Sequence, residues 1–190
     1  NSFKAAYRLH SLRQGCVPFN TNIDENSYSA TGADKTLSST WIYSNGFTTS
    51  GVYGATTLAA PGKYSFTLIV TSQKGCSDTI IEKDFSTVLP APDVKFGALD
   101  QEGCYASELF TFRDSTTNSK AWQWNFGDGT TSTDQHPTHT FPDTGLYNIS
   151  LTVYDTNNCG STITKANYIR ITTPWAGFRS NVEDGCKALN

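Results

Sequence analysis

An internal repeat is the feature that most constrains how this chain can fold. When the 190-residue sequence is laid on itself, Trp41 falls on Trp124 and Cys76 on Cys159, each 83 positions later, and no gap is needed between them. A repeat of this kind is best recognised before individual elements are assigned, because each copy must fold into the same unit. The sequence therefore predicts two units of one architecture in series.

Both copies have the alternation typical of strands. Apolar residues stand two apart in the stretch Tyr64, Phe66, Leu68, Val70 and again in Tyr147, Ile149, Leu151, Val153. Side chains two apart share one face of an extended chain, so each stretch predicts a half-buried strand. Turn signals recur every 8 to 12 positions and no segment has a helical period. The pattern predicts an antiparallel β-sandwich of about seven strands in each copy.

Glycine–cysteine and proline landmarks divide the chain. Gly-Cys pairs occur at 15–16, 103–104 and 185–186, and Pro92 and Pro174, each followed four residues later by a phenylalanine, mark a linker and a first strand. These landmarks predict one sandwich over residues 1–90, a second over 91–173, and the start of a third copy over 174–190. On this interpretation the chain is an internal piece of a longer protein.

The second copy resembles a known family. The segment WQWNFGDGTTSTDQHPTHTFPDTGLYNISLTV is similar to the PKD (polycystic kidney disease) domain, an immunoglobulin-like β-sandwich. The resemblance implies an all-β fold of tandem immunoglobulin-like (PKD) β-sandwiches. It also implies structural roles for Trp124, Phe126, Gly127, Asp128, Gly129, Pro137, His139, Gly145 and Tyr147, and through the repeat for Trp41. The first copy departs from the motif: Ser44-Asn45-Gly46 replaces Gly-Asp-Gly, and residues 54–58 lack the Pro-x-His-x-Phe run.

The paired cysteine landmarks are similar to those in tandem PKD repeats of large surface adhesins from gliding Bacteroidota. Such proteins are typically substrates of the type nine secretion system. The resemblance therefore implies a secreted, cell-surface location outside the cell. Composition alone does not imply it.

Charge and hydropathy exclude several function classes. The net charge of −3 gives no basic face for phosphates, so neither nucleic-acid binding nor attraction to anionic lipid is expected. No apolar run approaches the ~18 residues of a membrane span, so membrane insertion is not expected. Nucleophile elbows and His-Glu-x-x-His motifs are missing from the sequence, and we expect no enzyme activity.

The stretch WNFGDGTT, residues 124–131, has three interpretations. A phosphate loop is disfavoured because no helix pattern follows it. A hairpin is favoured, because Asp128-Gly129 supplies a pair suited to positive φ in a tight two-residue turn. Asn45 stands at the position of Asp128 in the first copy, so Asp128→Asn is expected to be nearly silent.

Metal binding is the third interpretation, and no cofactor is expected. Asp114, Asp128 and Asp155 lie near predicted strand ends, where calcium is a weak candidate because some members of the family bind it. Turn formation is the favoured role for these aspartates. His136 and His139 are three apart, yet Pro137 breaks any helix and no further ligands complete a zinc site.

Five cysteines, Cys16, Cys76, Cys104, Cys159 and Cys186, indicate disulfides in an exported chain. Pairing within copies would join Cys16 to Cys76 and Cys104 to Cys159. The strand order implied by the family places these partners at opposite ends of the sandwich, so the preferred pair is Cys16–Cys159, between repeats. On that scheme Cys76 pairs with a preceding copy, and Cys104 and Cys186 with following ones.

The leading functional interpretation is a structural or adhesive spacer in a large extracellular bacterial surface protein. Its expected partners are neighbouring repeats of the chain and, for adhesion, surface glycans or other proteins. The alternative is a non-catalytic PKD module of a secreted protease or polysaccharide-degrading enzyme. A third interpretation is a homo-oligomeric filament or appendage built from such repeats.

Overall fold

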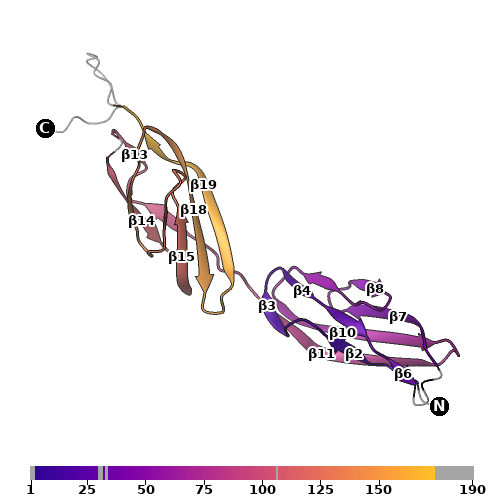
Figure 1. The fold of residues 1–190 in the computed structure, drawn as a ribbon. Coiled ribbons are helices and arrows are strands. Elements are labelled where there is room, and N and C mark those ends of the chain that lie inside the picture. Colours follow the sequence, from indigo (N-terminus) through magenta and orange to yellow (C-terminus); the bar gives the residue numbers. More distant parts are fainter. Residues whose placement is uncertain (1–2, 30–31, 33, 106, 174–190) are drawn as a thin grey trace. The chain divides into compact units, whose positions relative to one another are not determined.

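A computed structural model describes residues 3–29, 32, 34–105 and 107–173. Within these ranges every regular element is a strand (Figure 1). The chain divides into two compact units, residues 1–90 and 91–190. The predicted start of a third repeat, residues 174–190, lies outside the described residues.

In the second unit, two antiparallel sheets face each other. The larger sheet has the strand order β13-β19-β18-β15-β16, and the smaller has the order β12-β14-β17. The strands of the larger sheet are β13 (Glu102–Gly103), β15 (Ser119–Asn125), β16 (Thr131–Ser132), β18 (Gly145–Asp155) and β19 (Gly160–Ile171). Those of the smaller sheet are β12 (Phe96–Ala98), β14 (Leu109–Asp114) and β17 (Thr138–Thr140). Only β13 pairs in parallel, against the end of β19.

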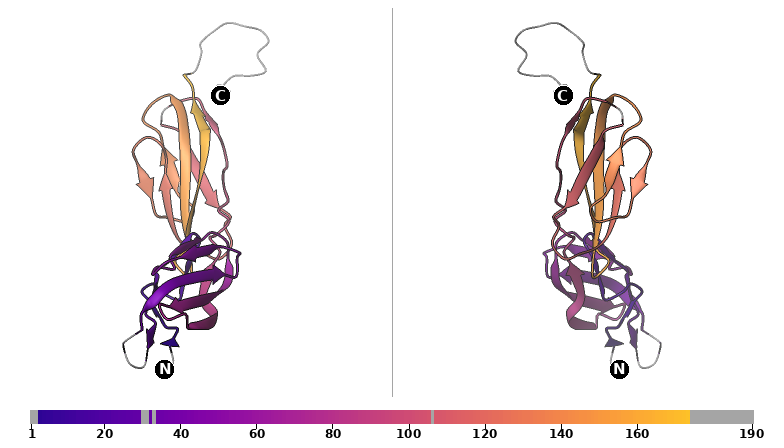
Figure 2. Two further views of the ribbon diagram at one scale, coloured as in Figure 1. Left: turned by 90° about the vertical axis from the view of Figure 1, so that its right-hand side faces the viewer. Right: turned by 90° about the vertical axis from the view of Figure 1, so that its left-hand side faces the viewer.

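The first unit repeats the larger sheet and breaks the smaller one into short pairs. In Figure 2 this unit is the part of the ribbon coloured from indigo to magenta. Its five-stranded sheet contains, in order, β3 (Gln14–Cys16), β11 (Ser77–Leu89), β10 (Gly62–Ser72), β7 (Thr36–Tyr43) and β8 (Thr48–Ser50). The pairs are β1 (Phe3–Lys4) with β6 (Tyr28–Ser29), β2 (Tyr7–Leu9) with β5 (Ile23–Glu25), and β4 (Phe19–Thr21) with β9 (Thr56–Leu58). Of these strands, only β9 lies in residues 54–58, where the first copy departs from the family motif; the other five lie in residues 3–29.

Each unit has its own core, built from the alternating residues that the sequence singled out. Trp41 and Trp124 are completely buried, and β10 and β18 each direct a row of apolar side chains inward. Aromatic rings pack around each indole, for example Phe66 at 5.3 Å from Trp41 and Phe96 at 5.2 Å from Trp124 between ring centroids. The predicted fold class is confirmed: the protein is all-β, with immunoglobulin-like β-sandwiches.

The two units share a β-bulge. The pairing register shifts between Tyr64 and Phe66 in the first unit and between Tyr147 and Ile149 in the second. Opposite the shift, Asp84 and Asn167 both have φ of 50°. In each unit one residue of β10 or β18 faces three on β11 or β19, so the bulged strand has two extra residues. Bulges increase the local twist, so both sheets bend at the same place.

The hairpin after the tryptophan strand differs from the prediction. Residues 44–46 and 127–129 form three-residue loops, closed by a hydrogen bond from Tyr43 N to Phe47 O and from Phe126 N to Thr130 O. Positive φ falls on Gly46, at 87°, in the first loop and on both Gly127, at 79°, and Gly129, at 92°, in the second, while Asp128 does not have it. The expected positive-φ pair Asp128-Gly129 was therefore wrong, because in the three-residue loop the left-handed conformation is taken by the glycines on either side of Asp128.

Gly127 and Gly129 allow a matched test of this loop. A Cβ on Gly127, which has φ of 79°, would lie 2.5 Å from the backbone oxygen of Asn148, whereas a Cβ on Gly129 meets open space. We expect Gly127→Ala to lower the free energy of unfolding by about 3 kcal/mol and Gly129→Ala by about 1 kcal/mol, from strain alone. Urea unfolding would measure both values, and equal losses would contradict the close approach to β18.

Candidate functional site

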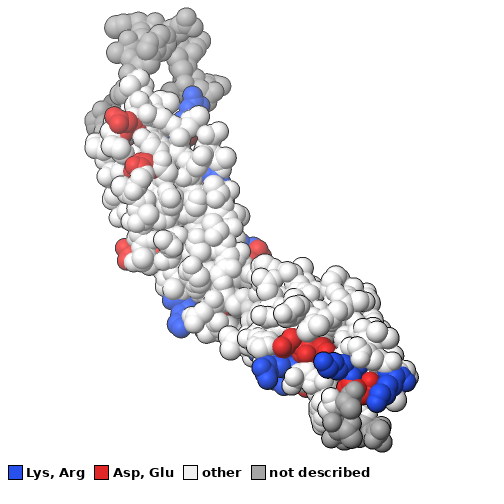
Figure 3. All heavy atoms as spheres, turned by 45° about the vertical axis from the view of Figure 1, so that its right-hand side comes forward, with Lys and Arg blue, Asp and Glu red and all other residues white. Residues whose placement is uncertain are grey.

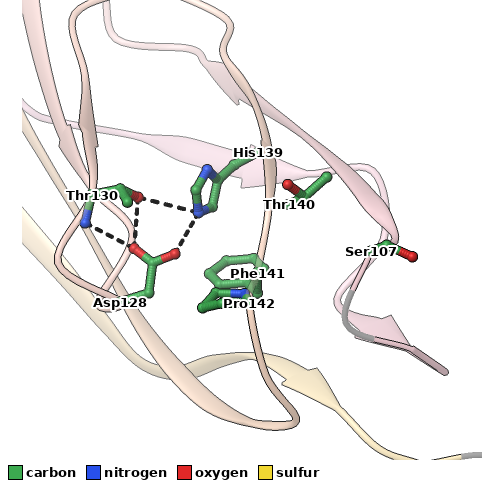
Figure 4. A pocket seen from close by; sticks show the side chains of 7 residues that line it. All are labelled: Ser107, Asp128, Thr130, His139, Thr140, Phe141 and Pro142. Atoms are coloured by element: carbon green, nitrogen blue, oxygen red, sulfur yellow. Dashed lines mark hydrogen bonds and ion pairs between the residues drawn. The ribbon is translucent and has the colours of Figure 1, made fainter.

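A shallow hollow lies beside this hairpin in the second unit. It has a volume of about 540 Å³ and is lined by Ser107, Asp128, Thr130, His139, Thr140, Phe141 and Pro142 (Figure 4). Three of these residues, Asp128, Thr130 and His139, form one connected polar group in its wall. Because polar groups that converge in a hollow are the usual sign of a binding site, this cluster is the candidate site of the second unit.

Asp128 is the centre of the cluster. Its side chain is only 2% exposed, and Oδ2 lies 2.7 Å from His139 Nε2. Oδ1 accepts hydrogen bonds from the Thr130 backbone N at 2.9 Å and from Thr130 Oγ1 at 2.6 Å. The carboxylate therefore closes the hairpin loop on one side and attaches it to β17 on the other.

His139 is held by aromatic rings as well as by Asp128. The Phe126 ring stacks on the imidazole with centroids 4.1 Å apart, and the Phe141 ring meets it edge-on at 4.7 Å. The side chain is 15% exposed, so one edge reaches the hollow. His139 and Phe141 are two residues apart along β17 and the loop after it, so their side chains lie on the same side of the chain. Both point toward the hairpin that contains Phe126 and Asp128.

The cluster does not have the geometry of a nucleophile triad. In such a triad the hydroxyl and the carboxylate contact opposite nitrogens of the imidazole. Here Thr130 Oγ1, at 3.2 Å, and Asp128 Oδ2 both contact Nε2. The Thr130 hydroxyl also donates to Asp128, so it has no free base beside it. The cluster is built to hold the hairpin against β17.

Hydrogen bonding outweighs burial at Asp128. Burial alone would raise the pKa of this carboxyl group, but donors from Thr130 and His139 stabilise the charged form and lower the pKa below its usual value. Such a carboxylate stabilises the folded state only while it is ionised. The expectation that Asp128→Asn is nearly silent is therefore revised: Asn45 has no histidine partner, and its Oδ1 accepts only from Phe47 N.

Asp114 forms a second buried hub. Its Oδ2 accepts from Trp122 Nε1 at 2.8 Å and its Oδ1 from Thr116 N at 2.9 Å, with Ser119 Oγ at 3.3 Å from Oδ2. Burial raises the pKa of this group, and the hydrogen bonds, foremost those from Thr116, more than reverse the effect and lower the pKa. The hub joins the end of β14 to the start of β15. In the sequence, only the alternation of Trp122 with Trp124 points to the Trp122 contact.

Asp155 caps the turn between β18 and β19. Its Oδ1 accepts from Asn157 N and Cys159 N, both at 2.8 Å. Asp114, Asp128 and Asp155 thus each serve a separate turn and do not come together. Among the described residues, no three His, Cys, Asp or Glu side chains are grouped so as to hold a metal ion.

The remaining motif residues have structural positions. The Pro137 carbonyl accepts from Phe112 N at 2.9 Å, which links the motif to β14. Tyr147 OH donates to the Asp143 carbonyl at 2.8 Å, and Gly145 begins β18 with φ of 159°. His136 is separate from His139: its Nδ1 accepts from Asp114 N at 3.2 Å. The two imidazoles therefore serve different contacts.

One stabilising group was missed by sequence reasoning. Lys165 Nζ donates to the Phe96 carbonyl at 2.6 Å and lies 4.5 Å from the centroids of the Phe96 and Tyr168 rings. A lysine over aromatic faces gains cation–π attraction, so Lys165 fastens β12 to the larger sheet. In the sequence, the only sign of this contact is that Lys165 stands two residues after Ile163, at a position whose side chain points to the same face of β19.

The cysteines of each unit lie at opposite ends of its longest strand. Gly103, next to Cys104, pairs with Ile171 at the end of β19, while Cys159 precedes the start of that strand. Eleven residue steps separate these ends, about 36 Å at the rise of a strand, far beyond the ~7 Å limit between Cα atoms of a disulfide. A bond from Cys104 to Cys159 is thereby excluded.

The first unit has the same arrangement. Cys16 pairs with Leu89 at the end of β11, while Cys76 precedes the start of β11. Cys16, Cys104 and Cys159 are disulfide-bonded, whereas Cys76 has a free, exposed thiol. Cys186 lies outside the described residues. Pairing of Cys16 with Cys76 is therefore excluded, and the Cys16–Cys159 pair stays a prediction.

A family comparison matches the second unit. The family model described as PKD domain matches residues 87–171. This range contains the whole larger sheet of the unit, the Asp128–His139 pair and the Asp114 hub. No helix among the described residues is long and apolar enough to cross a membrane.

Similar proteins include two proteases. Collagenase ColA of Bacillus cereus is 53% identical over 54 residues, which are 26% of this chain and 6% of the collagenase. Pre-pro-metalloprotease PrtV of Vibrio cholerae is 36% identical over 84 residues, 44% of this chain and 9% of PrtV. The chain therefore spans less than a tenth of these relatives. The crystal structure of the PKD1 domain from Vibrio cholerae PrtV is 26% identical with a TM-score of 0.37, covering 44% of this chain and 99% of that domain.

The Asp128–His139 pair makes the second unit sensitive to acid. Because the pKa of Asp128 is lowered in the folded state, its stabilising effect is complete above the unfolded pKa of about 3.9 and is lost as pH falls through the lower folded value. We expect Asp128→Asn to lower the free energy of unfolding at pH 7 by about 1 to 3 kcal/mol and to reduce its acid dependence below about pH 4. Urea unfolding at several pH values would measure both, with Asn45→Asp as the control; unchanged acid dependence would contradict the pairing.

Disulfide connectivity has a direct test. Peptide mapping without reduction should recover Cys16 and Cys159 in one linked peptide, and alkylation before reduction should label Cys76. A linked peptide containing Cys16 but not Cys159 would overturn the predicted pair. Reduction should lower the thermal midpoint, because the bond closes a loop of roughly 140 residues and such a bond is worth about 4 to 5 kcal/mol of chain entropy.

Proposed function

We propose that this chain is a pair of non-catalytic β-sandwich modules belonging to a larger secreted enzyme, whose catalytic part lies in another domain. The observation that carries the proposal is the PKD family match over residues 87–171 together with relatives that are named as a collagenase and a metalloprotease. In those relatives the matching segment is 6% and 9% of the protein, the share of an accessory module.

The second unit supports a non-catalytic role. Its polar cluster is occupied with internal hydrogen bonds, and the two bases beside the Thr130 hydroxyl, Asp128 and His139, are bonded to each other. A catalytic site needs groups poised to exchange protons with a substrate. A buried, fully hydrogen-bonded carboxylate instead serves stability.

The outer face of the larger sheet offers a surface suited to contact with an insoluble polymer. Hydroxyls line up across β18 and β19, with Ser150 Oγ 3.0 Å from Thr164 Oγ1 and Thr152 Oγ1 2.8 Å from Thr162 Oγ1. Gln123 pairs opposite Thr152 and extends the row onto β15. In the face shown in Figure 3, much of the second unit has no Lys, Arg, Asp or Glu. An uncharged row of donors and acceptors favours hydrogen bonding to collagen or polysaccharide over binding to a charged partner.

A second candidate is a spacer in an extracellular surface adhesin of the gliding Bacteroidota type, exported by type nine secretion. The serial repetition of one unit favours it, since length is gained simply by adding modules. An extracellular location fits both candidates, because disulfide-bonded cysteines persist in oxidising compartments.

Co-sedimentation separates the two candidates. The chain is mixed with insoluble collagen and, separately, with an insoluble polysaccharide, and the bound fraction is measured against Thr152→Glu/Thr164→Glu, with Thr57→Glu in the first unit as control. The targeting role predicts retention on one polymer and at least a several-fold loss in the double variant only. A folded chain that binds neither polymer would reject targeting and leave the spacer. Hydrolysis of a peptide substrate by the chain would reject both.

A further inference from the structure

An exposed tyrosine of the first unit is fixed beside a carboxylate. Tyr53 is 69% exposed and forms an isolated antiparallel β-bridge with Asp24 of β5. Two backbone hydrogen bonds flank this bridge, from Glu25 N to the Val52 carbonyl at 2.7 Å and from Gly54 N to the Ile23 carbonyl at 2.8 Å. When the bonds flank a pair in this way, its two side chains stand as close as antiparallel strands allow. The tyrosine ring therefore projects into water from a backbone that is held on both sides.

The side chains next to Tyr53 point away from the core. In the pairing of β2 with β5, Arg8 stands opposite Asp24, and the next pair is Leu9 with Ile23. Ile23 is completely buried and Leu9 packs against the core, so Arg8 and Asp24 point outward. His10 follows Leu9 and shares the outward side, where its Nε2 lies 2.6 Å from Asp24 Oδ1.

Arg8, His10, Asp24 and Tyr53 thus lie together on one surface, which we call the Tyr53 face. The His10 side chain is 41% exposed and the Asp24 side chain 26%, and Arg8 is exposed. The face crosses three neighbouring chain segments, about 10 Å at the spacing of strands. It combines one bare aromatic ring with a carboxylate acceptor and two side chains that carry N–H groups.

The second repeat uses the position of Tyr53 differently. His136 stands there, 83 residues later, and its Nδ1 accepts a hydrogen bond from Asp114 N at 3.2 Å. In the second unit this position therefore serves a contact inside the sandwich. In the first unit it presents most of a tyrosine side chain to water. A large exposed ring is not a requirement of the shared fold, which points to recognition as its role.

We propose that the Tyr53 face binds a neutral sugar residue of a glycan. A sugar ring has an apolar C–H face, which packs on the negative face of an aromatic ring, and a rim of hydroxyls that both donate and accept. On the Tyr53 face one hydroxyl donates to Asp24 while its neighbour accepts from Arg8. Both hydrogen bonds are charge-assisted and therefore stronger than neutral ones.

The charges of the Tyr53 face select against ionic ligands. The carboxylate of Asp24 is offset by the guanidinium of Arg8 directly opposite and by the imidazole of His10. An anion would be repelled by Asp24, and a cation by Arg8. The face lies in the first unit, whereas the hydroxyl row of the proposed function lies in the second, so this inference goes beyond that function and does not depend on it.

The test titrates the complete chain, labelled with nitrogen-15, with cellohexaose, xylohexaose and mannohexaose at millimolar concentrations. At least one of these neutral hexasaccharides should shift the backbone amide signals of residues 22–25 and 51–54 in a saturable manner. Tyr53→Leu should weaken this binding about ten-fold, because stacking is lost. Asp24→Asn should weaken it about five-fold, since a charged acceptor is replaced by a neutral one. Tyr53→Phe keeps the ring and should bind nearly as the wild type does.

Two controls separate this site from the rest of the chain. Tyr105→Leu removes a tyrosine that is 44% exposed in the second unit, and Thr152→Glu/Thr164→Glu alters the hydroxyl row. Both variants should leave the titration unchanged, whether or not the chain sediments with a polymer.

Several results would overturn the proposal. They are the absence of shifts with all three hexasaccharides, equal affinity of Tyr53→Leu and wild type, and tighter binding of the anionic hexagalacturonate. Stronger shifts of the same amides by a Pro-Pro-Gly repeat peptide would likewise overturn it, because the face would then recognise a polypeptide.

Discussion

The structure depends on one buried indole in each unit. Trp41 and Trp124 have no exposed surface, and each donates its indole N–H to a backbone carbonyl, Gly51 O at 3.0 Å and Asp134 O at 2.9 Å. A buried N–H without a partner costs on the order of 1 to 3 kcal/mol, so the chain after the hairpin must return across the ring to supply the acceptor. After supplying this carbonyl, the chain crosses from the larger sheet to the other layer of the sandwich. The indole hydrogen bond therefore helps to position the two layers. Gly54 shows how close the return is, because a Cβ there would lie 2.5 Å from the Trp41 ring.

The two units share the buried indole and the larger sheet, but their second layers differ. In the second unit His139 and Asp128 join β17 to the hairpin, and Asp114 joins β14 to β15. In the first unit other contacts stand at these places: Tyr43 OH donates to the Gly54 carbonyl, and Thr21 exchanges hydrogen bonds with Thr56. The hairpin and the strand after it are therefore joined through a carboxylate in the second repeat and through neutral groups in the first. This explains why the family motif is readable in the second copy only.

The polar cluster of Asp128, Thr130 and His139 stabilises the wall of the hollow that it lines. Asp128 and His139 satisfy each other, so the chemical groups left at the surface are the ring edges and hydroxyls around them. Function in such a unit resides on faces that the frame presents, since one fold can serve many roles. The hydroxyl row across β18 and β19 on the outer face of the larger sheet is one such face.

The sequence by itself determined the strands, the core and the repeat. Period-two alternation in Tyr147 to Val153 specifies which side chains face inward, because successive side chains of a strand point to opposite faces of the sheet. Only the tertiary structure decided the rest. Asp128 looked interchangeable with asparagine because its partner His139 is eleven residues away and meets it only after the sheets pack. The same holds for three other features: the three-residue hairpin, the link between Asp114 and Trp122, and the separation of Cys104 from Cys159 along β19. Each depends on the pairing register of the strands and on the packing of the two sheets, which set how far apart two residues lie in space.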